Sequence, residues 1–145
     1  MNFVRRGTNP GGWLALAATG VLLQACAQQP SGPGVRMFAA DMAGAAKTCV
    51  VPKVTPIANQ ETQVAMKVGS DGGWCGITVS NNGQPYAAGL VVAKPVHGQP
   101  FIHTVGNDTR IDYTPDRGVG GSDTFAVKLI PGDATIRVSV AIGSP

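Results

Sequence analysis

Close to its C-terminus the chain reads Thr124-Phe125-Ala126-Val127-Lys128-Leu129-Ile130-Pro131-Gly132-Asp133-Ala134-Thr135-Ile136-Arg137-Val138-Ser139-Val140. Large apolar side chains alternate with small or polar ones on both sides of the turn-forming Pro131-Gly132-Asp133. Successive side chains of a β-strand point to opposite faces, so each half of the stretch predicts a strand with one buried face. The predicted core positions are Phe125, Val127, Leu129, Ile136, Val138, Val140 and Ile142.

The same alternation continues upstream to about Thr48. Its apolar positions are Val64, Met66, Val68, Ile77 and Val79. Turn-forming residues separate the stretches at 70–73, 81–83, 105–108 and 131–133. Because this part of the chain has no long helical period, it predicts an all-β sandwich or barrel over residues 48–145. That length suffices for one two-layer core.

Between Val92 and Val140 the residues follow a family pattern. The motif consists of Pro95-Val96-His97-Gly98, Tyr113-Thr114-Pro115, then Gly121, Asp123 and Phe125, with an alternating strand after it. In order and spacing it resembles the bacterial immunoglobulin-like and cadherin-like repeats of secreted surface proteins. The resemblance implies a single immunoglobulin-like β-sandwich. It says little about activity, because such sandwiches host many unrelated roles.

Each motif residue has a structural explanation. Tyr113 and Phe125 are large apolar side chains that we expect to anchor the core. Pro115 fixes a backbone angle where a strand ends. Asp123 is expected to cap a turn by accepting backbone N–H bonds. We therefore interpret the motif as a signature of the fold and not as catalytic machinery.

The N-terminus has the layout of a secretory signal. Arg5 and Arg6 supply positive charge, and the apolar run Trp13–Leu23 is shorter than the roughly 20 residues that a membrane-spanning helix needs. The following Leu23-Gln24-Ala25-Cys26 resembles the lipobox of bacterial lipoproteins. Residues 1–25 are therefore predicted to be a lipoprotein signal peptide.

By that resemblance, Cys26 becomes the first residue of the mature protein and carries a thioether-linked diacylglycerol and an N-acyl chain. Two or more acyl chains hold a protein stably on a membrane. Ala27, in place of Asp, implies the outer membrane of a Gram-negative cell. The alternative is ordinary cleavage after Ala27, which would release a soluble product.

Residues 26–47 are predicted to be a flexible tether. The stretch 28–34 is polar and rich in proline and glycine, so it has little to bury. In Val35–Lys47 a few large apolar side chains lie among alanines, which allows one short, marginal helix. We interpret this second part as more linker, or alternatively as a docking segment that orders on a partner.

Lipidation of Cys26 would leave Cys49 and Cys75 as a pair. Exported proteins meet an oxidising compartment, where two such cysteines are expected to form a disulfide. The alternative is a metal site. Two cysteines without a CxxC spacing or neighbouring histidines make a poor zinc site, however, so we predict the disulfide.

The charge of the chain argues against one class of partner. The sequence has 11 basic and 8 acidic residues. Because Arg5 and Arg6 leave with the signal peptide, the mature chain has 11 − 2 = 9 basic residues against 8 acidic ones. No domain-wide basic patch is left to bind nucleic acid, so nucleic acid is not expected as a partner.

The two histidines give no sign of a metal or catalytic site. His97 lies in the motif turn, and we interpret it as structural or exposed. His103 alternates with Phe101 and Val105, which favours a structural or exposed side chain, with half-burial as the alternative. A hydrolase triad is not expected, since Ser122 lacks a G-x-S-x-G motif.

Four acids invite a calcium hypothesis: Asp108, Asp112, Asp116 and Asp123. Arg110 lies among them, however, and the sequence has no D-x-D-x-D-G loop. Asp112 sits between two core positions of a strand and is expected to face water. We therefore predict no metal site.

Trp74 is the candidate residue for contact with a partner. It stands beside Cys75 and follows the turn Asp71-Gly72-Gly73. In a sandwich such a tryptophan more often covers the disulfide, which is the structural alternative.

Together these observations predict a protein that is not an enzyme and that needs no cofactor. The first hypothesis is a membrane-anchored lipoprotein of the cell envelope that acts as a non-enzymatic binding or assembly module. Its partner would be another envelope protein or a surface component. The alternative is a periplasmic inhibitor or ligand-binding lipoprotein that inserts a loop near Trp74 into a cleft of its partner.

Overall fold

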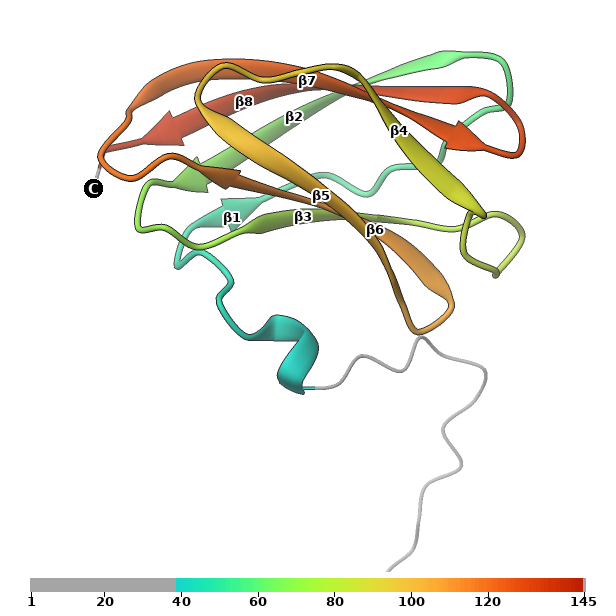
Figure 1. Ribbon diagram of the computed structural model, residues 1–145, viewed down its shortest axis with the longest axis horizontal. Coiled ribbons are helices and arrows are strands. Elements are labelled where there is room, and N and C mark those ends of the chain that lie inside the picture. Colours follow the sequence, from blue (N-terminus) through green and yellow to red (C-terminus); the bar gives the residue numbers. More distant parts are fainter. Residues whose placement is uncertain (1–38, 145) are drawn as a thin grey trace, which may run out of the picture. The chain divides into compact units, whose positions relative to one another are not determined.

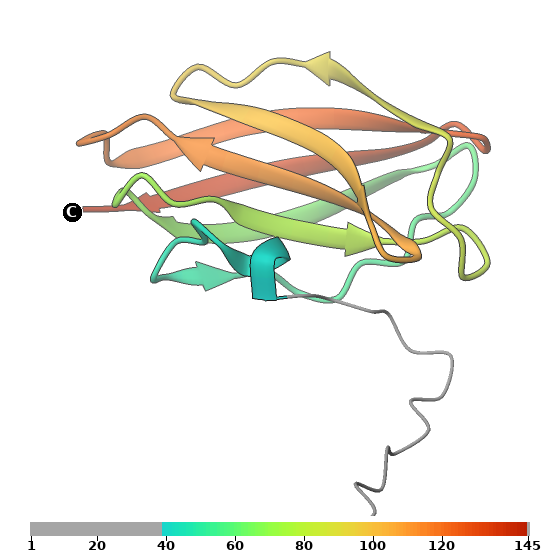
Figure 2. The ribbon, with the colours of Figure 1, turned by 60° about the horizontal axis from the view of Figure 1, so that its bottom comes forward.

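The computed structural model describes residues 39–144, which form two β-sheets stacked face to face (Figure 1, Figure 2). The five-stranded sheet has the order β1-β2-β8-β7-β4, and the three-stranded sheet has the order β3-β6-β5. The strands are β1 (Cys49–Val50), β2 (Glu61–Gly69), β3 (Cys75–Val79), β4 (Ala88–Ala93), β5 (Gly98–Val105), β6 (Asp108–Pro115), β7 (Gly121–Ile130) and β8 (Ala134–Gly143). The predicted all-β sandwich is confirmed.

The strands β7 and β8 lie inside the larger sheet and pair antiparallel. They are joined by the predicted turn, in which Gly132 and Asp133 have φ values of 102° and 52°. On the other side of β8, β2 runs parallel to it. Parallel neighbours need a long connection. Here that connection contains all three strands of the smaller sheet.

The core lies between the two sheets. The predicted core positions are all buried: Val64, Met66, Val68, Ile77, Val79, Phe125, Val127, Leu129, Ile136, Val138, Val140 and Ile142. Tyr113 of β6 and Phe125 of β7 bring the two sheets together, because both are 0% exposed and their rings stack with centroids 5.3 Å apart. Burying a side chain of the size of Phe125 contributes about 1.5 to 3 kcal/mol.

Cys49 of β1 and Cys75 of β3 form the predicted disulfide, with their Cα atoms 5.2 Å apart. Because β1 belongs to the larger sheet and β3 to the smaller one, the bond cross-links the two layers. The cysteines are 26 residues apart in sequence. Closing a loop of that length stabilises a fold by about 3 to 4 kcal/mol in the chain-entropy account.

The first described residues lie against the sandwich. The short 3-10 helix η1 (Ala39–Met42) precedes Ala45, which forms a β-bridge with Trp74, and Ala46 is buried (Figure 1). The sequence had suggested tether for residues 39–47, because apolar alternation starts only at Thr48. Backbone hydrogen bonds hold this segment, and such bonds leave no periodic pattern in a sequence.

The predicted signal peptide, Cys26 and the tether up to residue 38 lie outside the described residues. Within residues 39–144, no helix is long and apolar enough to cross a membrane.

Candidate functional site

A groove crosses the outer face of the five-stranded sheet. Its floor consists of side chains from β2, β8 and β7 that point away from the core. The strand register places them in two rows, Ala65–Ser139–Thr124 and Lys67–Ala141–Ser122. Five of these six side chains are small, so the middle of the face is lower than its surroundings.

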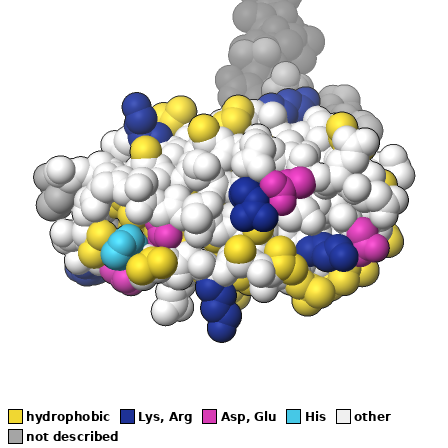
Figure 3. Space-filling model, turned by 90° about the horizontal axis from the view of Figure 1, so that it is seen from above, with side chains coloured by type: hydrophobic (Ala, Val, Ile, Leu, Met, Phe, Trp, Pro, Cys, Tyr) yellow, Lys and Arg dark blue, Asp and Glu magenta, His cyan; other side chains and the backbone are white. Residues whose placement is uncertain are grey.

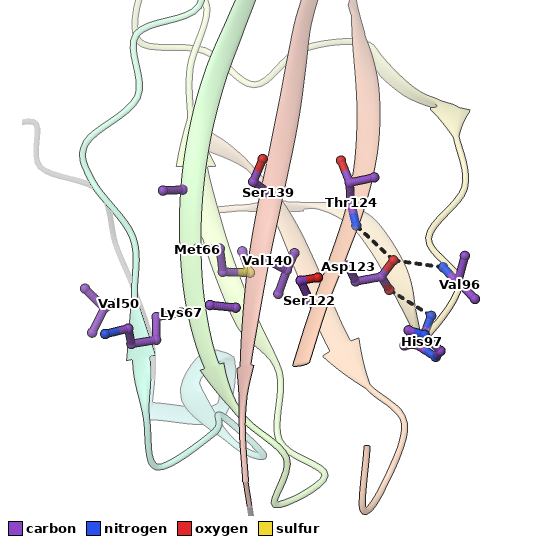
Figure 4. A pocket seen from close by; sticks show the side chains of 12 residues that line it. Val50, Met66, Lys67, Val96, His97, Ser122, Asp123, Thr124, Ser139 and Val140 are labelled. Atoms are coloured by element: carbon purple, nitrogen blue, oxygen red, sulfur yellow. Dashed lines mark hydrogen bonds between the residues drawn. The ribbon is translucent and has the colours of Figure 1, made fainter. Parts of the chain in front are cut away.

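The two ends of the groove carry larger side chains (Figure 4). Val50 of β1 and Lys67 of β2 lie at one end, and Val96 and His97 lie at the other, in the loop between β4 and β5. The groove has a volume of about 800 Å³. Ligand sites in proteins commonly enclose about 300 to 1,000 Å³, so this one is large enough for a peptide segment or a small molecule.

Asp123 fixes the loop that forms the second end of the groove (Figure 4). Its Oδ1 accepts hydrogen bonds from the backbone N–H groups of Val96 at 3.0 Å and Thr124 at 2.8 Å. Its Oδ2 accepts one from the backbone N–H of His97 at 2.8 Å and one from the Tyr113 hydroxyl at 2.7 Å. The sequence had suggested a turn cap at this position, and the bonds extend that role across the sandwich.

The environment of Asp123 shifts two pKa values. Burial by itself disfavours the charged carboxylate, but the bonds from Val96, Tyr113, His97 and Thr124 outweigh it and lower the pKa of Asp123. Burial, followed by the bond to Asp123, raises the pKa of Tyr113 well above its usual range. At neutral pH Asp123 is therefore charged and Tyr113 neutral, which is the combination that these hydrogen bonds need.

Exposed apolar side chains lie on the edge strand β4 and in the loop that follows it. Leu90 is 49% exposed, Val92 54% and Val96 79%. Seen from this side, the molecule shows apolar side chains gathered near one edge, with some charged side chains in pairs of opposite sign and other basic ones standing alone (Figure 3). Exposed apolar side chains gathered in this way often mark contact surfaces between proteins.

The opposite face, on the three-stranded sheet, holds a buried ionic cluster. Arg110 and Asp112 of β6 are only 6% and 5% exposed. The Arg110 Nε donates to Asp112 Oδ2 at 3.1 Å and lies 2.9 Å from Oδ1. His103 of β5 places its Nε2 2.9 Å from Asp112 Oδ2. The expectation that Asp112 faces water is therefore wrong, because neighbouring side chains and the N-terminal segment cover this side of the sheet.

The residue opposite Asp112 explains how a carboxylate fits there. Gly76 of β3 pairs with Asp112, and a Cβ atom at Gly76 would lie 2.4 Å from Asp112 Oδ1. Any other residue at Gly76 would collide with the carboxylate, since no real Cβ approaches an oxygen so closely. Glycine at this position thus makes room for the ion pair.

Trp74 fastens the N-terminal segment to this face. Its Nε1 donates to the Ala43 carbonyl at 2.9 Å, and its backbone exchanges hydrogen bonds with Gly44 and Ala46. The Arg110 guanidinium lies 4.0 Å from the centre of the Trp74 ring and also donates to the backbone carbonyl of Asp41. All these contacts are within the chain, so they give Trp74 a structural role.

The site residues suggested by the sequence fall in separate places. Tyr113, Asp123 and Phe125 meet in and beside the core, with Pro115 and Gly121 at the adjoining strand ends. Trp74 and Cys75 belong to the other sheet. Among residues 39–144, no three histidine, cysteine or acidic side chains cluster as metal ligands would.

Sequence reasoning missed the groove itself. One signal was present, because the outward positions of β2, β8 and β7 carry alanine, serine and threonine at their centre. Those residues read individually as ordinary solvent-facing positions. Only the register shows that they lie side by side across three strands.

Comparison with known proteins adds no relative. No family model, no curated protein and no solved structure matches this chain.

Proposed function

We propose that this chain is a lipid-anchored lipoprotein of the bacterial cell envelope, and that it acts as a non-enzymatic module that binds another envelope protein through the groove. The groove carries this proposal. It is a hollow with a floor of small side chains, its far end is held in place by Asp123, and exposed apolar side chains lie on the edge strand β4 and at Val96.

The side chains around the groove favour binding over catalysis. Ser122 and Ser139 are hydroxyl groups on the floor, and His97 is the imidazole at its end. A hydrolytic relay would need an acid that orients the imidazole. Asp123 instead accepts the backbone N–H of His97, and its two oxygens are occupied by four hydrogen bonds.

The anchor part of the proposal rests on Leu23-Gln24-Ala25-Cys26. Expressed in a Gram-negative host, the protein should enter the detergent phase on Triton X-114 partition, and Cys26→Ser should block maturation. A normally processed, water-soluble wild type would contradict the anchor and leave the groove untouched.

The binding part is tested by placing a photo-crosslinking residue at the groove. Val96→p-benzoylphenylalanine puts the reactive group at one end of the groove, on an exposed position. In intact cells it should give a discrete adduct with an envelope protein. Ser139→Trp, which fills the floor, should abolish that adduct.

The matched control is the same crosslinker at Thr78, an exposed position of β3 on the smaller sheet. It should give no such adduct. Equal adducts from both positions, or none from Val96, would reject the groove as the binding surface.

The alternative of an inhibitor that uses a loop near Trp74 has less support. The indole N–H of Trp74 and one face of its ring are already engaged by Ala43 and Arg110. A partner that bound the Trp74 side chain would first have to displace the N-terminal segment.

A further inference from the structure

We infer that the segment which occupies the groove is a peptide that carries carboxylates beside apolar side chains. This inference rests on the proposed function and adds the chemistry of the partner. Its basis is the distribution of charge on the outer face of the five-stranded sheet.

The carboxylates of this face are already satisfied within the chain. Glu61 accepts two hydrogen bonds from Arg137, each of 2.9 Å. Asp133 lies 3.3 Å from the Lys128 ammonium. Asp123 is held by the four bonds described above, so these three carboxylates already have partners within the chain.

One lysine of the groove is in the opposite situation. Lys67 forms one end of the groove, whereas Lys94, two residues before Val96, lines a separate hollow between β4 and β5. Within the described part of the chain, the Lys67 ammonium group has no ion-pair or hydrogen-bond partner. The groove therefore offers unused positive charge and an apolar surface together, and a partner with negative charge beside apolar groups complements both.

The dimensions fit a short peptide. Neighbouring strands lie about 4.8 Å apart, so the floor from β2 to β7 is about 10 Å long, and β1 and the loop at Val96 extend it to about 19 Å. An extended chain advances about 3.3 Å per residue and would place roughly six residues between the two ends. The small floor residues Ala65, Ser139 and Ala141 leave room for its side chains.

A second copy of this chain fits the groove less well. A symmetric dimer through this face would bring Lys67 of both copies to one interface, because such a contact uses the same patch twice. The carboxylates of Glu61, Asp133 and Asp123 already have partners within the chain. Charge complementarity thus points to a different, acidic chain.

The test uses a defined probe, a phage-displayed library of random 12-residue peptides selected on the purified mature protein in detergent micelles. Enriched peptides should combine Asp or Glu with apolar residues. Lys67→Glu should weaken binding of a selected peptide at least tenfold, and Lys67→Gln should have a smaller effect in the same direction. Lys53→Glu, a charge reversal at an exposed lysine that does not line the groove, should leave binding unchanged.

Other results of these binding experiments would overturn the inference. Binding lost in Lys67→Glu but kept in Ser139→Trp would place the peptide outside the groove and overturn the inference. Peptides without acidic residues, or no enrichment at all, would overturn it as well. A crosslink at Val96 that persists in Lys67→Glu would keep the proposed function and reject only the acidic partner. Thermal melting of each variant verifies that it is folded.

Discussion

The outer faces of the two sheets are covered in opposite ways. On the five-stranded sheet, small side chains leave a groove open to solvent, and the ion pair Glu61–Arg137 lies exposed beside it. On the three-stranded sheet, Arg110 and Asp112 are buried beneath Trp74 and the N-terminal segment. An outward-facing position of a β-sandwich is therefore not always a surface position. What lies on top of the sheet decides whether a charge there is structural or available to a partner.

The exposed and the buried ion pair also differ in their contribution to the free energy of unfolding. An exposed ion pair contributes little, because water screens it and both long side chains lose freedom. A buried pair contributes to stability only while it is intact, since removal of one partner leaves an unpaired charge in a dry place. We therefore expect the smaller sheet to be sensitive to charge substitutions on its outer face and the larger sheet to be tolerant.

The largest expected effect lies in the core that both faces share. Phe125→Ala should cost about 3 to 5 kcal/mol, comparable with the whole stability of a small domain. Chemical denaturation of the purified protein measures it, and both faces should unfold together. His97→Ala, at an exposed turn side chain, is the control and should cost under about 1 kcal/mol. A wild-type midpoint for Phe125→Ala would show that this strand does not face the core.

Substitutions on the outer faces of the two sheets should differ in cost. Asp112→Ala should cost about 3 kcal/mol, because it leaves the buried Arg110 charge without its carboxylate. The matched change on the other face, Ser139→Ala, should change the free energy of unfolding by less than about 0.5 kcal/mol. Trp74 fluorescence should shift in the first variant only, since Arg110 lies over that ring. Similar costs for the two variants would remove the distinction between the faces.

A smaller effect concerns the loop that ends the groove. Folding lowers the pKa of Asp123, so its charge stabilises the native state above the ordinary carboxyl pKa, and that contribution is lost as the pH falls toward the lower, native value. Asp123→Asn should cost about 2 kcal/mol at neutral pH, because two hydrogen bonds lose their acceptor. It should also flatten the decline in stability as the pH falls from the ordinary carboxyl pKa toward the lower native one. Denaturation series at several pH values would reveal a parallel decline in both proteins if Asp123 had no such role.

For added calcium we expect no effect on stability. Calcium at millimolar concentration should leave the melting temperature unchanged, because Asp112 and Asp123 already have internal partners. A cation present at 100 times its Kd would add about 2.7 kcal/mol and raise the melting temperature visibly. Calorimetry with and without calcium measures this, and a rise of several degrees would reveal a site that the internal contacts conceal.

Local pattern and composition determined much of this protein from its sequence. Alternation with a period of two identifies the core face of each strand without knowledge of its neighbours, since it depends on strand geometry alone. Turn residues such as Gly132 and Asp133 mark strand ends for a similar local reason, their tolerance of positive φ. The pairing of Cys49 with Cys75 followed from a count that left two cysteines over.

The tertiary structure alone decided what happens on the outer faces. Asp112 is shielded from water partly by the N-terminal segment, which is distant in sequence. Arg110, the partner of Asp112, also donates to the carbonyl of Asp41 in that segment, 69 residues away. The groove depends on register, which aligns Ala65 with Ser139 although 74 residues separate them along the chain. Side-chain alternation tells inside from outside, and it carries no information about which outward positions become neighbours or what covers them. What an outer face presents to solvent is therefore decided by long-range packing, while the core face of each strand is specified locally.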